Sequence, residues 1–408
     1  MSNKDRRTLI DELAGVALFD SRIEQTHIKL NDVQDRQERC EILQNELQIN
    51  KLKLEKECEK AKKYRKLNKC DLEISEIGFG TWAFSLPGWW GKKIDEDGAK
   101  RMLKKAYDLG INLFEMADMY GKGRAERIVG EVFKDMRNEV IFSTKYGYDF
   151  SEVQQIGHAE LPQRFSERDF SEKMLQDSLD RLQTDHVEIY GLHNPKLYHI
   201  QDQKVFEFLN EKIEEGKIKT FQSALGPAIG WTAEGLESME IENLSAVQTV
   251  FNLFEQVPGR ELLKNAENKN VGIFVRVPDA SGVLTGEMRT MEDVDKKIDD
   301  DDHRAVRKKE WFKSAFEKVK QVMPIGEKYG YDIMPLAMKF ILSKKAVTSI
   351  IPTFGSLEDI ESFVSISDGD YLKQEDVIEI EKIFDSWEPY ELKFTQPDVL
   401  NYINSKNT

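Results

Sequence analysis

From Tyr64 onward, short apolar segments rich in β-branched and aromatic residues alternate with amphipathic segments, and this alternation restricts the folds that the chain can adopt. Eight segments have the composition of buried strands, namely 77–82, 112–117, 140–145, 186–193, 218–225, 245–252, 271–278 and 347–354. The segments between them have helical periodicity, as in "DGAKRMLKKAYDLG" and "RAERIVGEVFKDM".

Strands that are separated by helices run parallel and are joined by right-handed crossovers. Eight such units over roughly 320 residues predict an α/β fold, the (β/α)₈ TIM barrel. A doubly wound sheet is the alternative, although the chain contains no G-x-G-x-x-G or G-x-x-x-x-G-K-[ST] turn.

Residues 1–63 differ from the rest of the chain, because they contain no proline, only one glycine and many Glu, Lys, Gln and Leu residues. Apolar residues recur there every three or four positions, which is typical of one face of a helix. One series comprises Leu9, Leu13, Val16, Ile23 and Leu30 and loses phase near Val33. A second comprises Cys40, Leu43, Leu47, Leu54 and Ala61, with Asn50 as a polar interruption. The pattern predicts a helical extension of coiled-coil character.

Two interpretations of this extension stay open. It is either a solvated helix with local charge pairs, or a helical hairpin or coiled coil that joins copies of the chain or binds another protein. We therefore expect a helical extension over 1–63, which is a candidate oligomerisation arm, a barrel over 64–390 and a C-terminal tail over 391–408.

The net charge of −15 disfavours nucleic acids and anionic membranes as partners. No apolar run approaches the about 18 residues that span a bilayer, and the N-terminal sequence lacks the apolar region of a signal peptide, so we expect a cytoplasmic protein. The three cysteines have no C-x-x-C spacing, and the acidic run 296–304 lacks the glycine and the final glutamate of an EF-hand. We therefore expect no metal site.

Polar residues cluster where three successive strand segments end, beginning with the stretch "INLFEMADMYGKG". They are Glu115, Asp118, Tyr120, Lys145 and His193. In a barrel, the carboxyl ends of the strands form one mouth, where chemistry takes place. A lysine ammonium beside a tyrosine phenol lowers the pKa of the phenol, and a carboxylate holds the lysine in place. Such a phenol can pass a proton to a carbonyl oxygen while a hydride reaches the carbon, and a neutral histidine can orient the same oxygen. We expect the second acid, Asp118, to make loop hydrogen bonds.

The chain from Tyr64 to about Trp387 resembles the aldo-keto reductases. The similarity rests on "YRKLNKCDLEISEIGFGTWAF", "GWWG", "GINLFEMADMYGKGRAERIVG", "IFSTKYG", "VEIYGLHNP" and "GVLTGE". The resemblance implies a catalytic tetrad of Glu115, Tyr120, Lys145 and His193, and NADP or NAD bound across the barrel mouth without a Rossmann motif. It also implies a pyrophosphate clamp in the loop 277–286 and an adenosine site in 355–362. The cofactor-binding residues that it implies are Gln248, Arg276, Val277, Pro278, Gly282, Leu284, Thr285, Gly355, Ser356, Asp359 and Ser362.

Four departures from the family pattern concern the site. Glu115 stands where the family has aspartate, and Ala224-Leu225 replaces the usual Ser-Asn pair that holds the nicotinamide carboxamide. Arg276 replaces a ring-stacking aromatic residue, although its planar guanidinium can still stack on the nicotinamide or reach the pyrophosphate. Asp359 falls where many members have an arginine for the 2′-phosphate, so we expect NADH to bind at least as well as NADPH.

The resemblance implies an oxidoreductase that reduces an aldehyde or ketone of small size, with Tyr120 as the general acid. Three tryptophans, Trp82, Trp89 and Trp90, either line the substrate cavity or pack beneath a loop. The alternative is a catalytically weakened regulatory or scaffold protein that acts through residues 1–63. The intact Tyr, Lys and His favour the enzyme, and the departures together with the extension favour the alternative.

Overall fold

The computed structural model describes residues 2–85, 94–152, 161–226, 231–300, 302–307 and 309–387. Two compact units divide the chain, Met1–Ala61 and Lys62–Thr408, and each is considered by itself. Trp89 and Trp90 lie outside the described residues, as does the expected tail 391–408.

Eight parallel strands form the centre of the second unit. They are β3 (Phe79–Gly80), β4 (Leu113–Glu115), β5 (Ile141–Tyr146), β6 (Val187–His193), β7 (Ile218–Ala224), β8 (Leu244–Val250), β9 (Gly272–Arg276) and β10 (Val347–Ile351). The strands lie in the sheet in the same order as in the sequence, and every pair of neighbouring strands is parallel. Bridges from Ile77 to Ile350 and from Gly80 to Thr353 join the last strand to the first. The sheet is therefore a closed barrel, the predicted (β/α)₈ fold is confirmed, and the doubly wound alternative is wrong.

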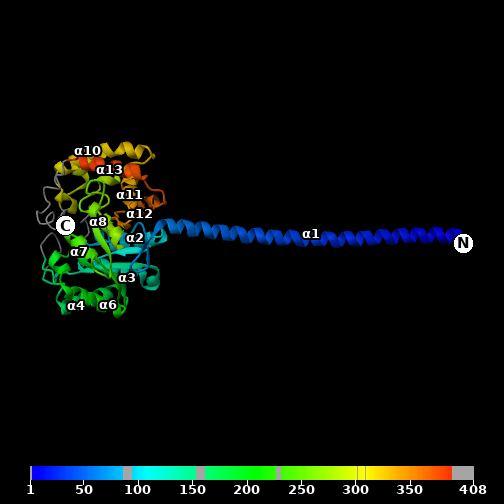
Figure 1. The fold of residues 1–408 in the computed structure, drawn as a ribbon, viewed down its shortest axis with the longest axis horizontal. Coiled ribbons are helices and arrows are strands. Elements are labelled where there is room, and N and C mark those ends of the chain that lie inside the picture. The colour runs from blue at the N-terminus through cyan, green and yellow to red at the C-terminus, as the bar shows by residue number, and fades with distance from the viewer. Residues whose placement is uncertain are drawn as a thin grey trace. The chain divides into compact units, whose positions relative to one another are not determined.

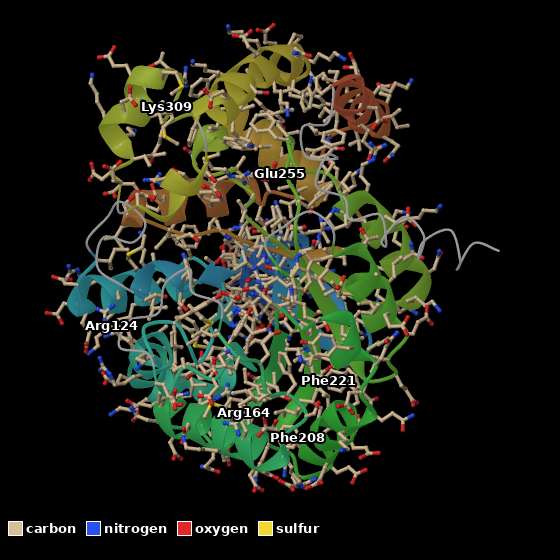
Figure 2. All side chains as sticks on the ribbon, turned by 90° about the vertical axis from the view of Figure 1, so that its left-hand side faces the viewer. Arg124, Arg164, Phe208, Phe221, Glu255 and Lys309 are labelled. Carbon is tan, nitrogen blue, oxygen red and sulfur yellow. The ribbon has the colours of Figure 1, made fainter. Side chains whose placement is uncertain are left out.

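Helices surround the barrel (Figure 1). They are α2 (Glu96–Asp108), α3 (Arg124–Phe133), α4 (Arg168–Leu182), α5 (Leu197–Ile200), α6 (Gln203–Glu214), α7 (Thr232–Met239), α8 (Gly259–Lys269), α9 (Met291–Lys297), α10 (Lys309–Glu327), α11 (Ile333–Leu342), α12 (Leu357–Ile366) and α13 (Gln374–Ser386). The first of them shows why the helices form here. Asp95 caps α2 by accepting a hydrogen bond from the Gly98 amide at 2.6 Å, and Met102 and Leu103 on its apolar face are buried. Figure 2 shows side chains filling the space between strands and helices, with the buried Phe208 and Phe221 among them.

A two-stranded antiparallel hairpin, β1 (Tyr64–Leu67) and β2 (Leu72–Ser75), precedes the barrel. Leu67 and Ile74 are fully buried and belong to a small apolar cluster with residues of the barrel strands, such as Ile189. Arg65 fixes the hairpin, because its guanidinium donates hydrogen bonds to the carbonyl oxygens of Leu342 at 2.6 Å and Val347 at 2.7 Å. The hairpin thus covers the amino-terminal end of the strands, and the sequence analysis did not anticipate it.

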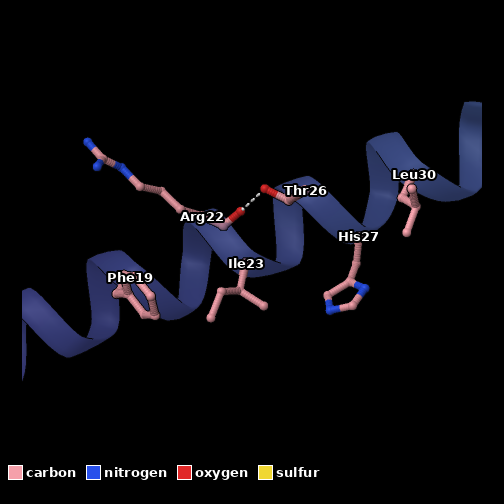
Figure 3. A pocket seen from close by; sticks show the side chains of 6 residues that line it. All are labelled: Phe19, Arg22, Ile23, Thr26, His27 and Leu30. Carbon is pink, nitrogen blue, oxygen red and sulfur yellow. Dashed lines mark hydrogen bonds between the residues drawn. The ribbon is translucent and has the colours of Figure 1, made fainter.

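One continuous helix, α1 (Asn3–Lys63), forms the first unit, and no turn interrupts it. The helical-hairpin interpretation of the extension is therefore wrong. Several apolar side chains of α1 face solvent, and Leu13, Leu43 and Leu47 are 59%, 56% and 67% exposed. A shallow hollow on this helix is lined by Phe19, Arg22, Ile23, Thr26, His27 and Leu30 (Figure 3). None of the described helices is apolar over a length that would span a membrane.

Candidate active site

Two charged residues meet at the carboxyl ends of β4 and β5. The Lys145 ammonium donates hydrogen bonds to Glu115 Oε1 and to the carbonyl oxygen of Met116. Both side chains are buried, with 1% and 4% of Lys145 and Glu115 exposed. Two buried charges are tolerated only as a bonded pair, so the lysine and the carboxylate fix one another in place.

The neighbouring strand makes room for the stem of the lysine. Gly191 of β6 lies opposite Lys145 in the register of the sheet. A Cβ atom on Gly191 would stand 2.8 Å from Lys145 Cγ and 3.1 Å from Gln222 Cγ, closer than side chains normally approach. The absence of a side chain at residue 191 therefore lets Lys145 run across the strand to the carboxylate.

Tyr120 lies on the turn between β4 and α3, beside this ion pair. The Lys145 Nζ atom is 4.8 Å from the centre of the Tyr120 ring, and Trp82 meets the same ring edge-on at 4.8 Å between centroids. Burial raises the pKa of Tyr120 well above its usual value, and the Glu115 carboxylate adds to this, whereas Arg276 opposes it. The sequence analysis expected a lowered pKa, but burial and the Glu115 carboxylate outweigh the opposing effect of Arg276. Tyr120 is a protonated phenol at neutral pH and can donate its proton.

His193 ends β6 and faces the same space. Its ring lies edge-on to Tyr120, with 5.9 Å between centroids, and to Tyr148, at 5.2 Å. Its Nδ1 atom is buried and has no hydrogen-bond partner among the described residues. Burial lowers the pKa of His193 well below its usual value, and Lys145 and Arg276 lower it further. The imidazole is thus neutral at pH 7 and can hydrogen-bond to a ligand. The sequence analysis missed Tyr148, whose hydroxyl accepts a hydrogen bond from the Asn194 side chain at 2.9 Å.

Gln248 and Arg276 complete the mouth from β8 and β9. The Gln248 Nε2 group donates a hydrogen bond to Glu115 Oε1 at 3.0 Å, and the Arg276 guanidinium donates one to the Leu225 carbonyl oxygen. In the described part of the chain, Gln248 Oε1 and Arg276 Nε are buried without a partner. Unpaired polar atoms in a buried mouth fit a ligand that brings its own donors and acceptors, as the amide and phosphates of a dinucleotide would.

The segment expected to clamp a pyrophosphate directly follows β9. Val277, Ala280, Ser281 and Gly282 have positive φ angles of 53°, 46°, 59° and 92°. Three of these residues are not glycine, so the backbone is strained, as is common in loops that bind ligands. Pro278, Leu284 and Thr285 lie in the same loop, and Thr285 Oγ1 donates a hydrogen bond to the Gly282 carbonyl oxygen at 2.8 Å.

The segment expected to hold the adenosine end forms the start of α12. Ser356 caps this helix by accepting a hydrogen bond from the Asp359 amide at 3.1 Å, and Asp359 Oδ2 accepts one from the Gly355 amide at 2.8 Å. Ser362 lies within the same helix. Asp359 therefore stabilises the first turn and brings negative charge to it.

Asp118 belongs to a different cluster. Burial raises the pKa of its carboxyl well above the usual value, and the nearby Glu126 carboxylate adds to the effect. Glu126 in turn accepts hydrogen bonds from Thr144 Oγ1 at 2.5 Å and from Arg181 Nε at 2.7 Å. These partners lie on β5 and α4, so Glu126 ties α3 to the barrel wall and to the next helix.

Comparisons with known proteins show which family this chain belongs to. The model of the aldo/keto reductase family matches residues 76–385. Aldo-keto reductase YhdN of Bacillus subtilis (strain 168) is 30% identical over 288 residues, which cover 69% of this chain and 81% of the relative. NADH-specific methylglyoxal reductase of Escherichia coli (strain K12) is 26% identical over 311 residues, which cover 73% of this chain and 91% of the relative. The chain belongs to the aldo/keto reductase family.

A solved structure shows the same fold. The glycerol dehydrogenase AKR11B4 from Gluconobacter oxydans superposes with a TM-score of 0.68 at 24% identity, over 81% of this chain and 97% of that chain. The family consists in general of oxidoreductases that use NAD or NADP, which fits the unpaired polar atoms of the mouth. Within the described ranges, no group of three or more His, Cys, Asp or Glu side chains is arranged to hold a metal ion.

Proposed function

We propose that this protein reduces the carbonyl group of a small aldehyde or ketone with a reduced nicotinamide dinucleotide, and that Tyr120 is the general acid. The observation that carries the proposal is the meeting of a buried phenol, a Lys145–Glu115 ion pair and a neutral His193 at one barrel mouth. Groups of these types, placed together, can donate a proton to a carbonyl oxygen and stabilise the charge that develops there.

Each side chain has a separate task in this mechanism. The bound cofactor supplies the hydride that the carbonyl carbon receives. Tyr120 gives its phenolic proton to the carbonyl oxygen, so that an alcohol results. The Lys145 ammonium stabilises the phenolate that forms, and Glu115 holds the ammonium. His193 donates a hydrogen bond that orients the carbonyl oxygen. Gln248, Arg276 and the segments 277–286 and 355–362 would hold the dinucleotide.

The first experiment is a titration with NADH followed by turnover. The relative from Escherichia coli is a methylglyoxal reductase and the structural neighbour is a glycerol dehydrogenase, so methylglyoxal and glyceraldehyde are suitable first substrates. Enhanced NADH fluorescence together with its oxidation by either aldehyde supports the proposal. Cofactor binding without turnover of any aldehyde would contradict it and favour the regulatory alternative.

We expect NADH to bind at least as tightly as NADPH. The first turn of α12 carries Glu358 and Asp359, and no Arg or Lys lies between Pro352 and Ile366. A 2′-phosphate would be repelled there, whereas a charge-assisted contact elsewhere in the family stabilises it by about 1.5–3 kcal/mol. Fluorescence titration of both reduced cofactors measures the ratio of the two dissociation constants.

A matched pair of variants tests the location of this effect. Asp359→Arg should shift the NADPH-to-NADH affinity ratio toward NADPH by about tenfold or more, because it exchanges repulsion for attraction. Glu358→Arg adds the same charge one residue away, on an exposed side of the turn, and should shift the ratio less. A tenfold NADPH preference of the unmodified protein would show that the phosphate pocket lies elsewhere.

We further propose that α1 is an oligomerisation arm, that the barrel domain covers 64–390, and that 391–408 is a tail. The partner that we favour is the α1 helix of a second copy. Cys40, Leu43 and Leu47 follow the 3–4 spacing of a coiled-coil seam and are exposed on α1. A helix of this kind obtains most of its stability from packing its apolar face, which a second copy would provide.

Leu43→Glu should convert the assembly into a smaller species, because it places a charge in the seam. Ile42→Glu is the matched control, since Ile42 and Leu43 are 57% and 56% exposed but Ile42 lies about 100° away around the helix. Light scattering measures the mass of each variant, and deletion of residues 1–60 should give the same number of chains per particle as Leu43→Glu. An unmodified protein that is monomeric at all concentrations would favour the solvated-helix interpretation.

A further inference from the structure

Glu115, one of the residues that depart from the family pattern, contacts more than Lys145. Its Oε1 atom accepts hydrogen bonds from the Lys145 ammonium and, at 3.0 Å, from the Gln248 side-chain amide. All three side chains are buried, with 4% of Glu115, 1% of Lys145 and 2% of Gln248 exposed. One carboxylate oxygen thus joins Lys145 to Gln248, a residue of the expected cofactor site.

This contact crosses the barrel mouth. Glu115 ends β4, which pairs with β3 and β5, whereas Gln248 lies on β8, which pairs with β7 and β9. The two strands are not neighbours, so only long side chains meet between them. Aspartate is shorter than glutamate by one carbon–carbon bond, about 1.5 Å. Aspartate at residue 115 would leave the Gln248 amide beyond hydrogen-bonding distance unless the backbone moved.

The Glu115 carboxylate also determines the orientation of the Gln248 side-chain amide. An ionised carboxylate only accepts hydrogen bonds, so the NH₂ group of Gln248 turns toward Glu115 and its oxygen turns away. That oxygen, Gln248 Oε1, is buried and has no hydrogen-bond partner within the described residues. This oxygen has a fixed orientation and can accept a hydrogen bond from an N–H group of a ligand.

We propose that Glu115 is a positioning residue for cofactor recognition, because it orients Gln248 so that its oxygen accepts a hydrogen bond from the carboxamide NH₂ of the nicotinamide. The inference rests on the proposed function. It assigns the glutamate a role that aspartate does not fulfil, and it accounts for carboxamide binding where Ala224-Leu225 replaces the usual polar pair.

Three variants separate orientation from charge. Glu115→Asp keeps the negative charge beside Lys145 but loses the reach to Gln248. Glu115→Gln keeps the reach, and its oxygen can still accept from Gln248, but the charge is gone. Gln248→Ala removes the acceptor itself. Thermal unfolding of each variant first establishes that the barrel is folded.

Equilibrium titration compares NADH with reduced 3-acetylpyridine adenine dinucleotide, an analogue in which an acetyl group without N–H replaces the carboxamide. The unmodified protein should bind NADH about tenfold more tightly than the analogue, since only NADH satisfies Gln248 Oε1. Glu115→Asp and Gln248→Ala should both remove this preference, and their combination should have no additional effect. Glu115→Gln should keep the preference and lower kcat.

The outcomes are distinguishable. If the unmodified protein binds neither dinucleotide, the proposed function fails. If it binds NADH and Glu115→Asp discriminates between the two dinucleotides as well as the unmodified protein does, the positioning role of Glu115 is refuted while the proposed function stands.

Discussion

Replacement of Tyr120 by phenylalanine is expected to lower kcat for aldehyde reduction by about 10²- to 10⁴-fold and to leave the dissociation constant of NADH nearly unchanged. The substitution removes only the hydroxyl, so the ring still packs against Trp82 and Lys145. The loss of the hydroxyl raises the energy of the transition state, in which a proton moves to the carbonyl oxygen. Stopped-flow or steady-state kinetics with methylglyoxal, together with NADH titration, measure the two quantities.

Tyr148→Phe is the matched control for this experiment. Tyr148 also faces His193, but its hydroxyl is engaged with Asn194, and we assign it no proton transfer. Its removal should reduce kcat far less than that of the Tyr120 hydroxyl. Comparable turnover by Tyr120→Phe and the unmodified protein would show that another group supplies the proton.

Lys145→Met is expected to destabilise the protein by about 3–5 kcal/mol in addition to abolishing turnover. The substitution keeps most of the volume of the side chain but leaves the Glu115 carboxylate buried, with the Gln248 amide as its hydrogen-bond donor among the described residues. A buried charge without its counter-ion destabilises the folded state by far more than the intact ion pair stabilised it. The free energy of unfolding in urea at pH 7 gives the size of the effect.

Two comparisons show whether charge is the cause. The double variant Lys145→Met with Glu115→Gln contains neither charge and should recover most of the lost stability, although it stays inactive. Lys66→Met removes the lysine of an exposed ion pair with Asp71 and should leave the urea midpoint nearly unchanged. Equal stability of Lys145→Met and the unmodified protein would mean that the Glu115 carboxylate takes up a proton or reaches water.

The barrel strands could be predicted because each one gives a local signal. A strand buried on both faces contains a short continuous run of apolar residues, and β6 and β9 contain such runs at 189–192 and 272–275. The polar residues at the ends of β4, β5 and β6 could be placed at one mouth because the carboxyl ends of parallel strands share one side of a barrel. Fold and candidate site thus followed from pattern and topology.

The hairpin β1–β2 was missed because its strands have only four residues each and are joined by a turn at Asp71 with a φ of 55°. Such short segments have no distinctive periodicity. The direction of the Tyr120 pKa shift was also wrong, because sequence shows which charges are present but not how deeply the phenol is buried. The contact between Glu115 and Gln248 joins residues 133 positions apart, and only the closed barrel reveals it.

Gly191 bears on how activity can be inferred for related sequences. The glycine contributes no reacting group, yet a larger residue there would push the stem of Lys145 away from Glu115. A lineage could therefore lose turnover through a change at this position while all four tetrad residues stay in its sequence. When relatives of this protein are sorted into enzymes and inactive descendants, the residue beside the lysine on the next strand is as informative as the lysine itself.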